Sequence, residues 1–113
     1  ELHSSIVKTF YEELVKLNKN LIKVNAIVQM KKISDINKVL KLLEENVLTQ
    51  WIEIITLYDT YEYELKCFEK EYNEMNQAWN DFTAQTTPQG YGEKLELFKK
   101  KNKKLMEVVN KKC

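Results

Sequence analysis

Few side chains in this sequence have the types and spacing that chemistry requires. His3 is the only histidine and lies at the start of the sequence, so we expect no catalytic constellation of serine or cysteine with histidine. Metal binding by histidine and cysteine needs ligands at short, defined spacing, and His3, Cys67 and Cys113 are far apart. We therefore expect no enzyme activity, no cofactor and no metal site.

Paired carboxylates are the other group that could act as acid and base. Such pairs include Glu44 and Glu45, Glu62 and Glu64, and Glu69 and Glu71. On a helix these spacings indicate a solvated face, and the Glu-x-x-His pattern of di-iron bundles is absent. We therefore expect these acidic residues to lie on the protein surface. The helices that carry them are defined by the apolar pattern.

An apolar stripe at heptad spacing runs from position 36 to position 82 without a glycine or proline. Its members are Ile36, Leu40, Leu43, Val47, Trp51, Ile54, Tyr58, Tyr61, Leu65, Phe68, Tyr72, Met75, Trp79 and Phe82. The steps alternate between three and four residues, except that Leu43, Val47 and Trp51 are separated by two steps of four. Apolar residues that repeat every 3.5 positions form a seam that is buried against another helix. The stripe predicts an all-α fold of the coiled-coil type.

The chain divides into three helical segments within a single domain, 1–113. We expect helices at about 4–30, 35–84 and 91–111, with a loop at 83–92 where threonine, proline and glycine gather. The leading prediction is a long central helix flanked by two shorter antiparallel helices in a coiled-coil-like bundle.

A compact up-down four-helix bundle with a break near Asp59 is the alternative. Asp59-x-x-Glu62 has the form of a capping box, which would start a new helix near residue 60. Against the break, Ile54, Tyr58 and Tyr61 carry the stripe across this point in phase. The continuous helix is therefore preferred.

Additional apolar residues broaden the central stripe between positions 33 and 58. They include Val39, Leu42, Leu48, Ile52 and Ile55. The first helix is broad too, and two helices with wide apolar faces cannot cover each other. We expect these residues to contact a second chain, which predicts a protein–protein interaction or scaffolding module that acts as a dimer or as a subunit of an assembly.

Charge is distributed unevenly along the chain. Residues 33–90 hold four lysines and eleven acidic residues, net −7, whereas residues 91–113 hold eight lysines and three glutamates, net +5. Five of those lysines form a candidate basic patch: Lys99, Lys100, Lys101, Lys103 and Lys104. The favoured interpretation is that they complement the acidic central helix. The alternative function is a module that binds anionic membrane through its lysine-rich C-terminal helix.

All eighteen basic residues are lysine, a bias typical of an AT-rich genome. Without arginine the chain lacks the bidentate fork that reads bases and phosphates, so sequence-specific nucleic-acid binding is not expected. No small-molecule substrate is indicated. A further alternative is an exported parasite or viral factor that binds a host protein. Localisation is not predicted.

The two cysteines are predicted not to bond with each other. If the last helix runs antiparallel to a continuous central helix, Cys113 falls beside residue 60, roughly 10 Å along the axis from Cys67. That exceeds the reach of a disulfide. We expect Cys67 to be a small residue at the edge of the core, and Cys113 to be a free thiol or to pair between chains.

Overall fold

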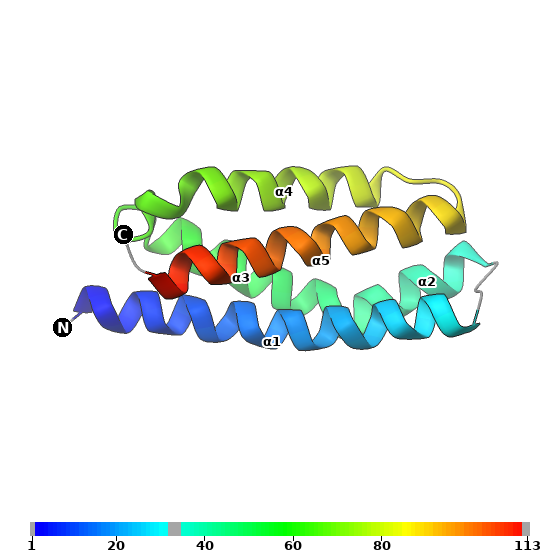
Figure 1. The fold of residues 1–113 in the computed structure, drawn as a ribbon, viewed down its shortest axis with the longest axis horizontal. Coiled ribbons are helices and arrows are strands. Elements are labelled where there is room, and N and C mark those ends of the chain that lie inside the picture. The colour runs from blue at the N-terminus through cyan, green and yellow to red at the C-terminus, as the bar shows by residue number, and fades with distance from the viewer. Residues whose placement is uncertain (1, 32–34, 112–113) are drawn as a thin grey trace.

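The computed structural model describes residues 2–31 and 35–111. Its elements are α1 (Leu2–Lys31), α2 (Ile36–Leu43), the π-helix η1 (Glu44–Leu48), α3 (Thr49–Thr60), the 3-10 helix η2 (Lys66–Phe68), α4 (Glu69–Thr83) and α5 (Pro88–Lys111). Because α2, η1 and α3 follow one another without interruption, the described residues form four rods, 48 Å long and about 20 Å across. Figure 1 shows α5 between α4 and α1, with the α2–α3 rod behind it. The prediction of an all-α helical bundle is confirmed.

The long central helix is the part of the prediction that is wrong. α3 ends at Thr60, a turn follows, and α4 begins only at Glu69, so the compact up-down bundle with a break near Asp59 is the version present. Asp59 does not cap a new helix, because it lies in the last turn of α3. In the turn, Leu65 N–H donates to the Tyr61 carbonyl at 3.0 Å.

The stripe crosses this break because its residues stay buried without a continuous helix. Leu65 is fully buried and Phe68 is 1% exposed, so both close the end of the bundle while the chain reverses. Reversal lets the second half of the stripe pack on the first, as the stacked rings of Tyr58 and Tyr72 show at 3.7 Å between centroids. A straight helix, rising 1.5 Å per residue, would hold the two halves of the stripe apart.

The irregular step in the heptad pattern coincides with the π-helix. η1 spans Glu44–Leu48, between Leu43 and Trp51, where the apolar residues are separated by two steps of four. A π-turn holds one residue more than an α-turn, so it absorbs the extra position. Leu43, Val47 and Trp51 consequently all face the core.

The connection before α5 is shorter than predicted. The expected loop covered residues 83–92, but α5 begins at Pro88. Proline suits the first turn of a helix, where its missing N–H would have no partner, and Thr87 Oγ1 accepts from Gly90 N–H at 3.1 Å. The glycines therefore lie inside the first turns of α5.

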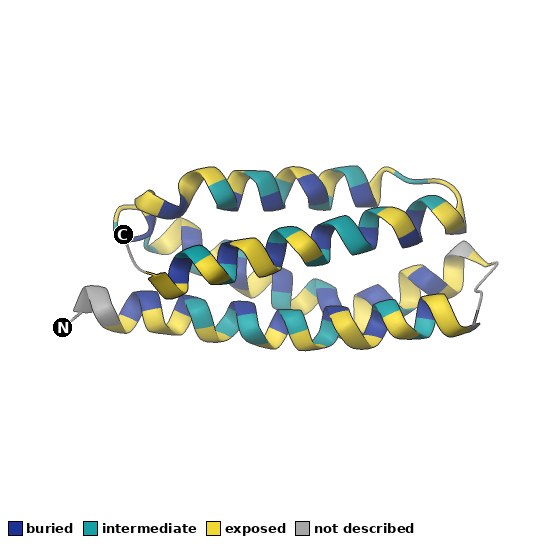
Figure 2. Ribbon diagram, in the orientation of Figure 1, coloured by how far each residue is buried: buried dark blue, intermediate teal, exposed yellow. Residues whose placement is uncertain are grey.

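α5 supplies the surface that was expected from a second chain. It packs against both α1 and α4, and Leu95, Phe98 and Leu105 on its inner face are fully buried. Figure 2 shows the buried residues on the faces that the rods turn toward one another. The wide faces of α1 and the α2–α3 rod are thus covered within this chain along most of their length.

Candidate partner-binding seam

The four rods are not equally close on all sides. Close approaches, with Cα atoms within 8 Å, link α4 with α5, α5 with α1, and α1 with the α2–α3 rod. Among the described residues, no Cα atom of α2 or α3 comes that close to α4. We call the side of the bundle between α3 and α4 the α3–α4 seam.

Aromatic rings bridge this seam and hold its two backbones apart. Trp51 lies 6.2 Å from Tyr72 and 5.9 Å from Trp79, measured between ring centroids. Tyr58 stacks on Tyr72 with the two planes only 7° apart. Rings of this size fill a wide interface where leucine and valine would draw the backbones together. The seam is therefore wide at the backbone and filled by rings in its interior.

The α3 edge of the seam is apolar. Leu48, Ile52, Ile55 and Asp59 are spaced by four, three and four residues, so they share one face. The opposite flank faces α1, because Asn20 Nδ2 donates to Gln50 Oε1. Leu48 and Ile55 are half-buried, and Ile52 is 51% exposed. This flank of α3 thus carries a large apolar side chain that is half exposed to solvent.

The α4 edge carries a half-buried tryptophan, neutral polar side chains and the carboxylate of Glu69. This face repeats at spacings of three and four: Glu69, Tyr72, Asn76, Trp79 and Thr83. The other flank of α4 faces α5, where Glu74 meets two lysines. Trp79 is half-buried, although it contacts Trp51, Phe82 and Phe98.

The residues predicted to contact a second chain separate into two groups. Leu48, Ile52 and Ile55 lie at the seam, whereas Val39 is completely buried and cannot contact a partner in this conformation. Leu42 is half-buried against the core. The prediction for Val39 is wrong because α5 of the same chain covers this end of the rod.

The α4 side of the seam was not predicted. Trp79 belongs to the heptad stripe but lies far from Ile52 in the sequence. Asn76 and Asn80, one turn apart, lie on the same flank of α4 as Trp79. This flank borders α3 only because the chain reverses at residues 61–68, which brings Trp79 to Trp51. The available sequence signal is the aromatic run itself, and it indicates core packing rather than an edge.

Two tyrosines at one end of the seam have raised pKa values. Burial is the main cause for Tyr72, whose pKa it raises to about 12, with smaller contributions from Asp59 and Tyr58. Burial also raises the pKa of Tyr58, and the negative charges of Glu69, Glu62 and Asp59 add to the effect. The Tyr58 hydroxyl is buried and has no hydrogen-bond partner among the described residues.

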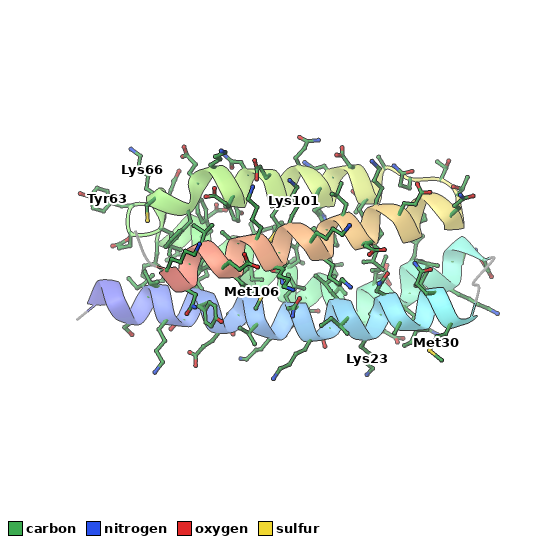
Figure 3. The ribbon with its side chains drawn as sticks, in the orientation of Figure 1. Lys23, Met30, Tyr63, Lys66, Lys101 and Met106 are labelled. Carbon is green, nitrogen blue, oxygen red and sulfur yellow. The ribbon has the colours of Figure 1, made fainter. Side chains whose placement is uncertain are left out.

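The lysines of the predicted basic patch divide between two sides of α5. Lys101 and Lys104 reach toward α4, with their Nζ atoms 3.9 and 3.6 Å from Glu74 Oε1, and Figure 3 shows Lys101 between the two helices. Lys99, Lys100 and Lys103 form no ion pair within residues 2–31 and 35–111. At this partial exposure each ion pair contributes about 0–1 kcal/mol.

The cysteine prediction is corrected for Cys67. This residue is exposed and disulfide-bonded, so it is not a small residue at the edge of the core. The register that separated the two cysteines assumed a continuous helix, whereas Cys67 lies in η2 at the chain reversal, close to α5. The prediction for Cys113 concerns a residue outside those that the structure describes.

Other kinds of site find little support in the described part of the chain. No group of three or more histidine, cysteine, aspartate or glutamate side chains there could hold a metal ion, and the side chain of His3 is not described. None of the described helices is long and apolar enough to cross a membrane.

Comparison with protein families, curated proteins and solved structures gives no significant match to this chain. A function must therefore be inferred from the geometry and chemistry of its own residues.

Proposed function

We propose that this protein is a non-enzymatic interaction module that binds a helix of a partner protein in the α3–α4 seam. The observation that carries the proposal is Ile52, a large apolar side chain 51% exposed between two rods whose backbones do not approach closely. A partner helix that lay over this face would cover apolar side chains at spacings of three and four residues. The module would act as one subunit of a helical assembly.

The seam supports this proposal better than the lysine-rich surface supports membrane binding. A membrane-binding helix presents apolar side chains next to its lysines. In α5 the apolar side chains Leu95, Phe98 and Leu105 are fully buried in the bundle. The seam, in contrast, combines exposed apolar surface with neighbouring half-buried residues, Leu48, Ile55 and Trp79.

A designed amphipathic peptide tests the proposal. The peptide has about 18 residues, roughly 27 Å as a helix, with leucine along one face and glutamine elsewhere. Because Trp79 lies in the seam, we expect a saturable change in tryptophan fluorescence on titration. Ile52→Asn should weaken binding by at least about tenfold.

Ile22 provides a matched control, because it is also 51% exposed but lies on α1. Ile22→Asn should leave the peptide affinity unchanged. Equal weakening by Ile22→Asn and Ile52→Asn, or no saturable binding at all, would contradict the proposal. Circular dichroism establishes that both variants keep the helical content of the parent.

Self-association is the version of this proposal in which the partner is a second copy. In that case sedimentation equilibrium gives a mass that rises with protein concentration, and Ile52→Asn abolishes the rise while Ile22→Asn does not. A concentration-dependent mass that Ile52→Asn leaves intact would place the self-association elsewhere and remove the dimer from the proposal.

A further inference from the structure

The α3–α4 seam lies in the most acidic part of the chain. Between Leu42 and Leu65 there are six acidic residues and no lysine. The outer edge of the α3 side repeats at three and four residues through Glu45, Thr49, Ile52, Thr56 and Asp59. This edge therefore offers carboxylates and hydroxyls beside an exposed apolar side chain, and no cation.

The α4 side has the same character. Its outer edge runs through Glu69, Asn73, Asn76, Asn80 and Thr83, again without a lysine. The lysines of α5 that pair with α4 do so on the opposite flank, at Glu74. Neither edge of the seam thus contains a positive charge that could neutralise its carboxylates.

A buried hydroxyl without a partner marks the acidic end of the seam. Tyr58 is only 4% exposed, and its hydroxyl makes no hydrogen bond within the described residues. The carboxylates of Glu69, Glu62 and Asp59 are close enough for their charge to act on this hydroxyl. An ammonium or guanidinium group placed beside this end of the seam could donate charge-assisted hydrogen bonds to the exposed carboxylates of Asp59, Glu62 and Glu69.

We infer that the seam takes a basic amphipathic helix of another protein, with an apolar stripe flanked by lysine or arginine. The inference rests on the proposed function, and it names the chemistry of the partner. Contact with Ile52 and Trp79 would bury the apolar stripe of the partner helix. The acidic edges of the seam would favour a partner whose flanking side chains are positively charged. The lysine-rich α5 of a second copy is not the occupant, because its apolar face is buried in its own bundle.

Two designed peptides with the same leucine stripe test this inference. One carries lysine and the other glutamate at the remaining positions, and binding is again followed by tryptophan fluorescence. The unmodified protein should bind the leucine–lysine peptide at least about tenfold more tightly than the leucine–glutamate peptide, and added salt should narrow the difference.

Charge reversal at the seam should reverse this preference. The double variant Asp59→Lys, Glu69→Lys is expected to bind the leucine–glutamate peptide more tightly. The control, Glu12→Lys, Glu107→Lys, changes the net charge equally at exposed positions of α1 and α5 and should keep the preference for lysine. A control that reverses as fully as the seam variant would show attraction by net charge alone and overturn the inference.

The outcomes separate the inference from the proposed function. If both peptides bind equally well and Ile52→Asn still weakens them, the seam is a docking site whose partner is not selected by charge, and the basic partner is wrong. If no peptide binds in a manner that depends on Ile52, the proposed function itself fails.

Discussion

Tyr72 is held between the two edges of the seam, and its ionisation is coupled to folding. Burial raises its pKa to about 12 from a usual value of 10.0. As the pH rises past 10 the unfolded chain loses this proton before the folded chain does. The resulting stabilisation is complete below pH 10 and is lost as the pH approaches 12.

Replacing Tyr72 by phenylalanine should remove this pH dependence while keeping the ring. We expect the free energy of unfolding of the parent to fall between pH 10 and about 12 by up to roughly 2 kcal/mol more than that of Tyr72→Phe. Urea unfolding across this interval measures both. Parallel curves for parent and variant would contradict the burial of an ionisable hydroxyl at this position.

Asn102 shows how one residue can align two helices. It occupies an apolar position of the α5 stripe, is fully buried, and donates from Nδ2 to the Leu14 carbonyl of α1 at 3.1 Å. A buried amide whose nitrogen finds its acceptor in one register favours that register, although Asn102 Oδ1 has no hydrogen-bond partner among the described residues. Its place in the stripe could be predicted, but its partner, 88 positions away, could not.

At the scale of elements, the π-helix is the feature whose role can be isolated. A π-turn holds one residue more than an α-turn, so deletion of the exposed Glu45 from η1 should leave a continuous α-helix from α2 to α3. We expect this variant to fold with a free energy of unfolding within about 2 kcal/mol of the parent. Urea unfolding followed by circular dichroism gives the value.

A deletion in regular α-helix is the control for η1. Glu53 is exposed in α3, and its removal turns every later residue of that helix by about 100°. Ile54 and Tyr58 would leave the core, so we expect a loss of more than about 4 kcal/mol or no folding. Similar losses for the two deletions would show that η1 is not the site of the extra residue.

At the scale of the whole molecule, Trp51 joins three of the four rods. Its ring contacts Tyr72 and Trp79 of α4 and, edge-on at 5.2 Å, Phe98 of α5. Because the side chain is 1% exposed, Trp51→Ala should lower the free energy of unfolding by about 3–5 kcal/mol. Urea unfolding measures the loss.

Tyr63 is the matched aromatic residue outside the core. It is 88% exposed and points away from the bundle at the chain reversal (Figure 3). Tyr63→Ala should change the free energy of unfolding by less than about 0.5 kcal/mol. Comparable losses from Trp51→Ala and Tyr63→Ala would mean that the seam rings do not hold the bundle together.

Helical periodicity determined which face of each segment is apolar, because the spacing of three and four is a local property of the chain. It therefore predicted the all-α bundle, and it placed Leu48, Ile52 and Ile55 on a flank of the stripe. The irregular step between Leu43 and Trp51 is also visible in the sequence, but periodicity alone does not show that a π-helix accommodates it.

Only the tertiary structure decided where the stripe folds back on itself. Residues 61–68 give up regular helical hydrogen bonds so that Tyr58 can stack on Tyr72 and Leu65 can close the end of the bundle. The lost helical hydrogen bonds are local, whereas the contacts that compensate for them join residues distant in sequence. No periodicity of the sequence therefore reports whether the chain reverses here. The same reversal placed Trp79 across from the α3 flank and brought Cys67 to the end of α5. The α3–α4 seam exists only because this chain reversal places α4 beside α3.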